Sequence, residues 1–271
     1  MSETASAVAS PAANEPILLQ RIADGVATLT LNRPAARNAL SMALMGELID
    51  ALAALESDPA VKVVVIAAAG PAFCAGHDLK ELRSDPRREA YEATFAHCSR
   101  LMLALTHLPK PVIARVHGMA TAAGCQLVAS CDLAVAADVA RFATPGVNIG
   151  LFCSTPMVAL SRAVPRKQAM EMLLTGDAID AGRAREIGLV NRVVPAAALD
   201  DAVDTLARQI AGKSPLTLAI GKEAFYRQLE LGLAEAYDYA AAAMTTNMLA
   251  ADAAEGIDAF LAKRPPAWRG C

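Results

Sequence analysis

The sequence has few of the features that mark nucleic-acid-binding or membrane proteins. Aromatic residues make up 4% of its 271 residues, with four tyrosines and one tryptophan, and no run of lysine or arginine occurs. Proteins that bind nucleic acids use aromatic rings to stack bases and basic clusters to neutralise phosphates. No apolar run approaches the ~20 residues that a membrane-spanning helix needs. We therefore expect no nucleic-acid partner and no membrane span.

Cysteine and histidine are also few, and their spacing does not suggest a metal site. The cysteines stand at positions 74, 98, 125, 131, 153 and 271, without a Cys-x-x-Cys pair. The histidines, at 77, 97, 107 and 117, form no ligand-like spacing with them. This pattern predicts reduced thiols, no structural metal and a reducing compartment.

The start of the sequence does not have the pattern expected of a secretory signal. Residues 1–16 are rich in alanine, serine and proline, and they lack both a basic start and an apolar core. Such a segment cannot act as a signal peptide and has little to bury. We expect residues 1–16 to form a disordered tail and the protein to be cytoplasmic.

Residues that build a core are abundant, because 55% of the chain is hydrophobic, 20% is charged and the formal net charge is −3. Asp24-Gly25 predicts a hairpin between residues 17–22 and 26–31, and Ser41 is placed to cap an amphipathic helix. Short β-branched segments at 61–67, 111–116 and 132–136 alternate with helical periods. This alternation predicts a layered α/β fold.

The C-terminal part of the chain is predicted to be helical. We expect three helices, at 198–211, 215–229 and 233–251, the last with an apolar stripe. The stripe consists of Leu233, Tyr237, Ala240, Met244 and Met248. Such a stripe docks on the core or on a neighbouring subunit.

The stretch 67–82 holds the first candidate site. A buried strand ends there in small residues, with Gly70-Pro71 to turn the chain and Ala75-Gly76 without bulk. Asp78 is placed as a helix N-cap, with Glu81 three residues later as in a capping box. A bare strand-to-helix turn aims unpaired N–H groups outward, where they hold an oxygen that gains negative charge. The alternative is a tight strand-to-helix turn without any chemistry.

A second turn of this kind follows the strand at 111–116, where residues 117–126 are again small and lead into a helix. Two such turns can present two N–H donors to one point. That arrangement is the oxyanion hole that thioester chemistry needs, which favours an enzyme.

Several ordered motifs resemble those of the enoyl-CoA hydratase/isomerase, or crotonase, superfamily over residues 17–269. They are L-N-R-P at 31–34 with N-A-L at 38–40, F-C-A-G-H-D-L-K-E-L at 73–82, G-C at 124–125 with C-D at 131–132, T-G at 175–176 with G-L-V at 188–190, and F-L-A-K-R at 260–264. The resemblance implies a spiral of ββα units and an acyl-CoA ligand. It also implies a core at 17–197 and a C-terminal helical region at 198–271 that forms trimers or dimers of trimers.

The resemblance further assigns roles to single residues. It implies that the backbone N–H groups of His77 and Ala123 are the two oxyanion donors, with Ala123 in place of the usual glycine. Positions that match the family's coenzyme A contacts and acyl pocket follow in the same way. The coenzyme A contacts would be Ala75, Lys80, Phe260 and Lys263, the last two from an adjacent subunit, and the acyl pocket would include Leu151, Phe152 and Cys153. Coenzyme A enters only as part of the substrate, and no separate cofactor is expected.

The chain departs from the family where proton transfer takes place. Hydratases of this family hold a water between two glutamates, and here Gln126 and Gly146 occupy the two positions. An amide has no titratable site and glycine has no side chain. Each lost proton-transfer group typically costs ~10²–10⁴ in rate, so we expect a weak hydratase.

Few residues can take over this function. Asp78 and Asp132 are expected to be caps or framework residues, and Glu81 could face either way. Cys153 is either a nucleophile or a buried, inert thiol. The sequence thus leaves two hypotheses: an enzyme that hydrates, isomerises or transfers the acyl group of a coenzyme A thioester, and a non-catalytic acyl-CoA-binding or assembly protein on a crotonase scaffold.

Overall fold

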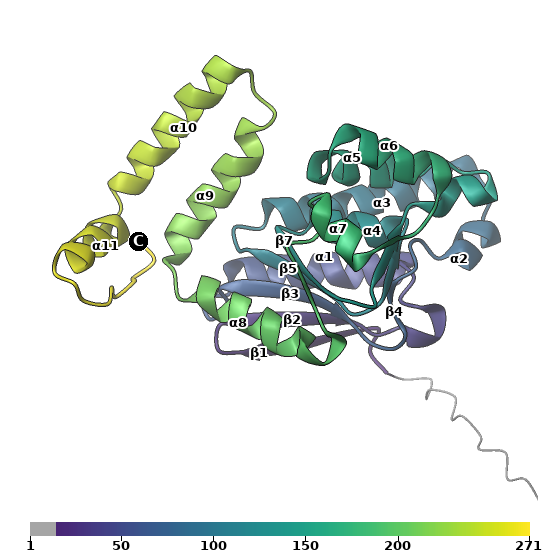
Figure 1. Ribbon diagram of the computed structural model, residues 1–271, viewed down its shortest axis with the longest axis horizontal. Helices are drawn as coiled ribbons and strands as arrows, with labels where there is room; N and C mark the ends of the chain where they lie inside the picture. The colour runs from purple at the N-terminus through teal and green to yellow at the C-terminus, as the bar shows by residue number, and fades with distance from the viewer. Residues whose placement is uncertain (1–14) are drawn as a thin grey trace, which may run out of the picture.

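The computed structural model describes residues 15–271, which form a layered α/β core and a helical arm (Figure 1). The predicted tail therefore lies outside the described residues, except for Glu15 and Pro16. Asn32 Nδ2 donates a hydrogen bond to the Pro16 carbonyl at 2.8 Å, which fixes the chain at the entrance to the first strand.

The main sheet has six strands and follows the alternation that the sequence predicts. The first two strands pair antiparallel across Asp24 and Gly25, both at positive φ, so the predicted hairpin is confirmed. All later neighbours pair parallel. In sheet order the strands are β1 (Leu18–Ala23), β2 (Val26–Leu31), β3 (Val63–Ala68), β5 (Val112–Val116), β7 (Leu133–Ala137) and β10 (Arg192–Val194).

A second, smaller sheet consists of strands of two or three residues, which the sequence analysis missed. In order they are β4 (Ala72–Cys74), β6 (Met119–Thr121), β8 (Arg141–Ala143) and β9 (Ile179–Asp180). Three successive strands of the main sheet, β3, β5 and β7, are each followed by one of the smaller sheet. The chain therefore winds as a spiral of ββα units. Strands this short carry no alternation that a sequence pattern can reveal.

Helices cover both sheets. Ser41 caps the first helix, as predicted, by accepting a hydrogen bond from the Leu44 N–H. One core cluster fills the space between the sheets and the surrounding helices, and a second lies between the main sheet and α8. The core helices are α1 (Met42–Ser57), α2 (Leu79–Ser84), α3 (Arg88–His107), α4 (Ala123–Ser130), α5 (Ser154–Ala163), α6 (Arg166–Thr175), α7 (Ala181–Glu186) and α8 (Leu199–Ala211).

Three further helices, α9 (Pro215–Gln228), α10 (Leu233–Met248) and α11 (Ala251–Leu261), project from the core as an arm (Figure 1). The three helices expected after residue 197 correspond to α8, α9 and α10, and the sequence analysis missed a fourth helix, α11. Ala250 is extended (φ −72°, ψ 145°) and starts α11. Residues 249–255 contain no glycine or proline, so the local sequence does not signal that one helix ends there and another begins. Because α8 covers the main sheet, the arm is shorter than the predicted region 198–271.

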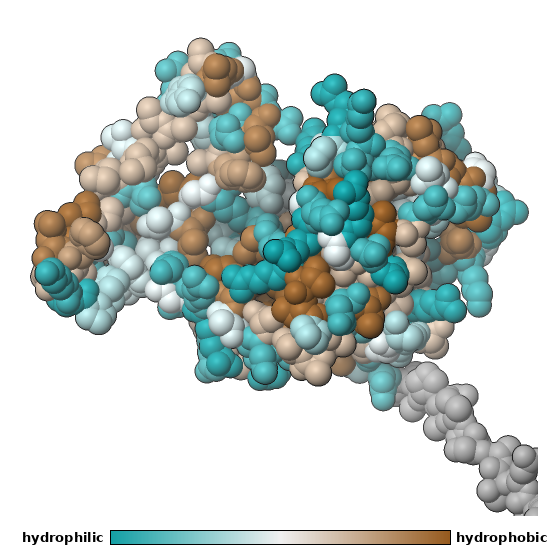
Figure 2. Space-filling model, in the orientation of Figure 1, coloured by the Kyte–Doolittle hydropathy of each residue, from teal (hydrophilic) through white to brown (hydrophobic). Residues whose placement is uncertain are grey.

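The arm has almost no core of its own. Helices α9 and α10 contain no buried residue. Apolar side chains that are more than half exposed lie along it, namely Phe225, Leu229, Leu233, Tyr237, Met244, Met248, Leu249, Phe260 and Leu261. Figure 2 shows apolar residues gathered over α11 and along α10. An exposed apolar surface of this kind marks an interaction site.

A buried polar cluster connects the arm to the core. Lys222 on α9 is 2.7 Å from Asp132, which follows α4, and its ammonium also donates to the carbonyls of Leu105 and Lys110. Tyr226, one turn further along α9, donates to the other Asp132 oxygen at 2.8 Å. The expectation that Asp132 is a framework residue is therefore confirmed.

Candidate active site

The two small-residue turns leave neighbouring strands of the smaller sheet at matching positions. Strands β4 and β6 are parallel, and Cys74 is paired with Ala120. His77 follows Cys74 by three residues, and Ala123 follows Ala120 by three. Both residues follow the last paired position at the same offset, which indicates that they lie close together beyond the ends of the strands. The two strand-to-helix turns, which are distant in the sequence, thus form one site.

Glycines allow the two turns to approach this closely. A Cβ on Gly76, where φ is +91°, would lie 2.9 Å from the Ala122 Cβ and 3.3 Å from the Ala123 nitrogen. A Cβ on Gly124 would lie 2.1 Å from the Cys74 carbonyl oxygen. Ala122 itself has a φ of 50°, which is unfavourable for a residue with a side chain. Strain of this type occurs at functional sites.

Both predicted donor N–H groups lack a backbone partner among residues 15–271. Ala123 is the first residue of α4, so its N–H has no acceptor within the helix. The His77 N–H makes no backbone hydrogen bond, although its neighbours do: Leu40 N donates to Gly76 O, and Asp78 N donates to Leu40 O. Two adjacent, unpaired N–H groups are suited to hold a developing oxyanion.

The first turn is held from outside by the segment before α1. The Asp78 carboxylate caps α2 through the N–H groups of Lys80 and Glu81, as predicted, and it accepts a hydrogen bond from Arg33 Nη2 at 2.9 Å. Although partial burial raises the pKa of Asp78, these bonds outweigh it and hold the pKa below its usual range. Asn38 donates to the carbonyls on either side of the Gly70-Pro71 bend. The sequence analysis did not assign this role to Arg33 or Asn38.

Glu81 does not complete the predicted capping box. Its carboxylate accepts a hydrogen bond from the Met42 N–H at 2.9 Å, at the start of α1. The carboxylate thus connects α2 to the start of α1 instead of capping its own helix. A capping box is a local pattern, and here a residue 39 positions away supplied the better donor.

Gln126 lies one helical turn after Ala123. Its side chain is 4% exposed, and its Oε1 is 3.8 Å from the Cys98 thiol. Gly146, in the 3-10 turn Pro145–Ile149, is also buried. A Cβ at this position would lie 2.7 Å from the Leu151 carbonyl oxygen and 2.9 Å from Cys153 Sγ. Backbone and a thiol therefore fill the space where a second glutamate would begin.

The thiols at the site are poorly suited to nucleophilic attack. Burial raises the pKa of Cys98 and of Cys125 to about 12. Burial also raises the pKa of Cys153, and the backbone N–H of Gly146 offsets this only in part. Because the thiolate is the nucleophile, these groups are inactive near neutral pH. The structure favours the buried, inert cysteine at 153.

The side chain of His77 is a feature that the sequence analysis set aside. Its ring packs edge-on against Phe95 of α3, with the ring centroids 5.5 Å apart and the planes at 83°. Its Nε2 is buried without a hydrogen-bond partner in the described part of the chain. Burial lowers the pKa of His77 to about 4, so the ring is neutral near pH 7.

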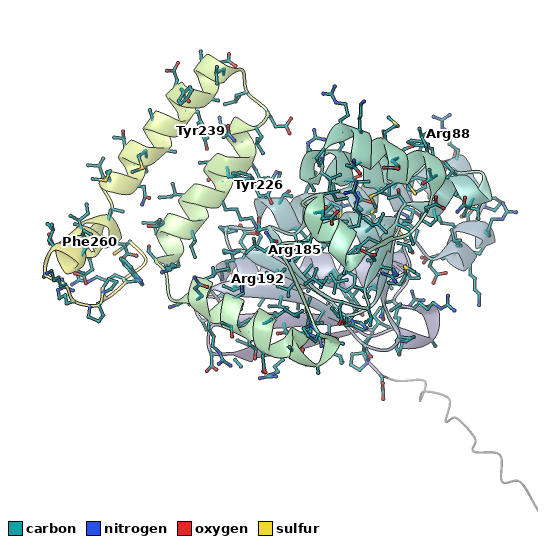
Figure 3. All side chains as sticks on the ribbon, in the orientation of Figure 1. Arg88, Arg185, Arg192, Tyr226, Tyr239 and Phe260 are labelled. Carbon is teal, nitrogen blue, oxygen red and sulfur yellow. The ribbon has the colours of Figure 1, made fainter. Side chains whose placement is uncertain are left out.

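The predicted coenzyme A contacts fall into two groups. Ala75 and Lys80 flank the first turn, and Lys80 is exposed at the start of α2. Phe260 and Lys263 are exposed at the end of the arm. Figure 3 shows Phe260 at the opposite end of the molecule from Arg88, which begins α3 next to α2. A single chain does not bring the two groups together.

The acyl-pocket residues lie close to the second missing carboxylate. The Leu151 N–H donates to the Gly146 carbonyl at 2.9 Å, which folds the segment 150–153 over Gly146. Leu151 and Phe152 remain about half exposed, whereas Cys153 is buried.

The comparisons with known proteins agree with this geometry. A family model described as enoyl-CoA hydratase/isomerase matches residues 21–271. The chain belongs to this family. The crotonase-type α/β fold expected from the motifs is thereby confirmed, and members of the family act on acyl-CoA thioesters.

Solved structures and curated relatives place the chain more closely within the enoyl-CoA hydratase/isomerase family. An enoyl-CoA hydratase from Mycobacterium smegmatis is 57% identical, with a TM-score of 0.92, and the match covers 94% of this chain and 99% of that one. Human enoyl-CoA hydratase domain-containing protein 3 is 48% identical, with a TM-score of 0.91, and the match covers 93% of this chain and 100% of that one. The rat protein of the same name is 48% identical over 96% of this chain and 87% of its own length. The motifs at 121–132 and 142–156 already indicated similarity to that protein.

The expectation of a cytoplasmic protein is wrong by this comparison. The curated relatives called enoyl-CoA hydratase domain-containing protein 3 are all named as mitochondrial proteins. The expectation rested on the composition of residues 1–16, and composition alone does not determine a compartment.

Residues 15–271 contain neither a membrane-spanning helix nor a cluster of metal ligands. No helix there combines the length and apolar character needed to cross a bilayer. Within the same residues, no group of three or more histidine, cysteine or acidic side chains is placed to hold a metal ion.

Proposed function

We propose that this member of the enoyl-CoA hydratase/isomerase family binds an acyl-CoA thioester and stabilises the enolate form of its acyl group. The backbone N–H groups of His77 and Ala123 would donate to the thioester oxygen. The observation that carries the proposal is their equal offset from the parallel pair Cys74 and Ala120. Donors that are fixed before the reaction stabilise developing charge without reorganisation.

The rest of the ligand would be held on both sides of the oxyanion hole. Ala75 and Lys80 lie where coenzyme A would pass, and a lysine suits a phosphate as a point charge. The acyl chain would lie against the segment Leu151, Phe152 and Cys153. No cofactor beyond the coenzyme A of the substrate is needed for this chemistry.

The protein would be a weak hydratase. The Gln126 amide can orient a water but cannot accept its proton, and the space at Gly146 is closed by Leu151 and Cys153. Addition of water to a 2-enoyl-CoA needs a proton removed from water and a proton added at C2. Isomerisation, in which a single group moves one proton, is less affected by the loss of two carboxylates.

The proposed assembly is a homotrimer or a dimer of trimers, built through the arm. Its support is the exposed apolar surface of α9–α11 together with the distance of Phe260 and Lys263 from the first turn. In an assembly, these two residues would reach the coenzyme A bound by a neighbouring subunit.

A second candidate is a non-catalytic acyl-CoA-binding or assembly protein. Gly146 favours it, because the chain has closed the position of the second glutamate as well as losing the side chain. Both candidate functions predict that the protein binds acyl-CoA, but only the enzyme would convert it to a product.

The experiment measures binding of crotonyl-CoA and the loss of its conjugated-thioester absorbance. We expect binding with slow or undetectable hydration in the unmodified protein. Gln126→Glu, which keeps the side-chain shape and adds a titratable group, should raise hydration by ~10²-fold or more. Efficient hydration by the unmodified protein would contradict our interpretation of Gln126 and Gly146.

Gly146→Glu is the matched comparison. It adds the second carboxylate, but its Cβ would meet the Leu151 carbonyl and Cys153 Sγ. We expect it to lower stability without raising the rate of hydration. Failure to bind crotonyl-CoA at all would overturn both candidate functions.

A further inference from the structure

Three buried side-chain nitrogen or oxygen atoms lack a hydrogen-bond partner within residues 15–271: His77 Nε2, His117 Nδ1 and Thr144 Oγ1. His117 is partly satisfied, because its other ring nitrogen is 2.9 Å from the Gly70 carbonyl. His77 belongs to the residue whose backbone N–H is a proposed oxyanion donor. A buried polar atom without a partner is rare and needs an explanation.

Carboxylates around the two turns are already engaged. Asp78 accepts from Arg33 and from the N–H groups of α2, and Glu81 accepts from the Met42 N–H. Asp132, which follows the C-terminal end of α4, accepts from Lys222 and Tyr226. Each of these three carboxylates therefore already accepts at least one hydrogen bond from the protein. In contrast, Nε2 of the His77 imidazole has no hydrogen-bond partner among residues 15–271.

The His77 ring and the Gln126 side chain each contact helix α3. The ring packs against Phe95, and the Gln126 carboxamide is in contact with the Cys98 thiol. Phe95 and Cys98 are three residues apart on α3, so they lie on one face of that helix. The imidazole therefore stands one helical turn from the amide that replaces the first glutamate.

We propose that the His77 imidazole is the base that exchanges a proton with C2 of the bound acyl group. The inference rests on the proposed acyl-CoA function. Nε2 takes the C2 proton, and the electron pair of the broken C–H bond forms the C1–C2 double bond. The carbonyl electron pair moves onto the thioester oxygen, where the N–H groups of His77 and Ala123 stabilise it. The imidazolium returns its proton to C2, or to C4 when the double bond shifts.

The environment of His77 gives it suitable basicity. Burial lowers the pKa of His77 to about 4, close to the ~4.3 of a glutamate carboxylate. A neutral ring with its proton on Nδ1 thus offers Nε2 as a base of glutamate-like strength at pH 7. Phe95 packs edge-on against the ring and is 39% exposed. In the proposed reaction this side chain would rotate to let Nε2 reach the acyl group.

The test is exchange of the C2 protons of butyryl-CoA in D₂O, followed by NMR. This saturated thioester can be deprotonated but cannot be hydrated, so exchange needs only a base and an oxyanion hole. We expect exchange with the unmodified protein and a loss of ~100-fold or more in His77→Gln. Butyryl-CoA affinity, measured by calorimetry, should change less than threefold. The matched control is His107→Gln, since His107 is exposed at the end of α3 and its loss should leave the exchange unchanged.

A second readout does not depend on turnover. The ¹⁵N shifts of the His77 ring report its tautomer, and we expect a protonated Nδ1 and a shift of the Nε2 signal when butyryl-CoA binds. Exchange in His77→Gln at the rate of the unmodified protein would overturn the inference. Tight binding of butyryl-CoA without any exchange would also overturn the inference, but it would support the proposed binding of acyl-CoA. Absence of binding would overturn the proposed function and the inference together.

Discussion

Gln126 and Gly146 differ in how much of the family's site each has lost. Gln126 keeps the size and position of a glutamate, and only its proton-accepting oxygen is missing. At Gly146 the segment 150–153 has moved into the space of the side chain, so that Leu151 and Cys153 block even a Cβ. We therefore expect one substitution to restore the first carboxylate site but not the second.

His77 should make the stability of the protein depend on pH. Its pKa is lowered from 6.5 to about 4, so between these values the unfolded chain binds a proton that the folded protein excludes. Stability therefore falls as pH decreases from about 6.5 towards 4. Between pH 7 and pH 5 we expect this one group to cost about 2 kcal/mol in the free energy of unfolding, by proton linkage.

Urea unfolding of the unmodified protein and of His77→Gln at pH 7 and pH 5 measures this contribution. The difference between the two pH values should be about 2 kcal/mol smaller in the variant, since glutamine does not titrate. His107→Gln is the control and should keep the full difference. An identical difference in the His77 variant would mean that the ring is accessible to protons in the folded state.

At the scale of elements, the docking of α4 on β4 determines where the second donor lies. Gly124 is the second residue of α4, and no other residue type fits against the Cys74 carbonyl at that distance. The short helix is buried along nearly its whole length. Its N-terminus is therefore positioned by close backbone contact rather than by flexible side chains.

Gly124→Ala should push α4 away from β4. Because the new Cβ would lie 2.1 Å from the Cys74 oxygen, the helix must shift, and overpacking of this kind typically costs about 1–3 kcal/mol. Acyl-CoA affinity should fall as the Ala123 N–H moves away from the His77 N–H. Urea unfolding and a butyryl-CoA titration measure the two effects.

Gly46→Ala provides the comparison, since a Cβ there meets only the His97 ring, at 3.6 Å. In the interior of α1 this change should be neutral or stabilise the protein by up to about 1 kcal/mol. If Gly124→Ala behaved in the same way, close backbone contact would not be what positions α4.

At the scale of the whole molecule, the arm exposes apolar side chains that no other part of the described chain covers. It is attached through Lys222, Tyr226 and Asp132, and desolvation lowers the pKa of Lys222 even though Asp132 opposes this. Beyond that anchor, α10 and α11 present a mostly apolar surface to solvent. The anchor positions the arm, and a neighbouring copy of the chain would cover the apolar surface of α10 and α11.

Leu233→Asp should therefore break the proposed assembly without unfolding the chain. Leu233 is 78% exposed, so the substitution leaves the fold of one chain unaffected. A charge buried between subunits is costly, and the protein should shift from trimers or hexamers towards monomers. Light scattering coupled to gel filtration measures the mass. Coenzyme A affinity should fall in parallel, because Phe260 and Lys263 would no longer reach a neighbour's site.

Val139→Asp introduces the same charge at an apolar residue outside the arm that is 63% exposed. It should leave the mass of the assembly unchanged. A monomeric unmodified protein with full coenzyme A affinity would contradict the proposed assembly.

The sequence by itself determined the parts of the protein that depend on neighbours along the chain. Asp24-Gly25 specified the hairpin, Ser41 and Asp78 specified two helix caps, and the two small-residue turns marked the positions of the donors. These features follow from local dihedral preferences, capping and hydrophobic period, which residues a few positions apart control. The ordered motifs also indicated the family, which the comparisons confirmed.

Tertiary structure alone decided which residues meet. The partner of Glu81 is 39 residues away, and the segment that closes over Gly146 is held by a bond from Leu151 to a turn that no local pattern distinguishes. The pairing of Cys74 with Ala120 aligns the two donors, and the packing of His77 on Phe95 leaves Nε2 without a partner. Such contacts depend on the sheet register and on the distance between packed backbones. Local sequence preferences determine neither of them.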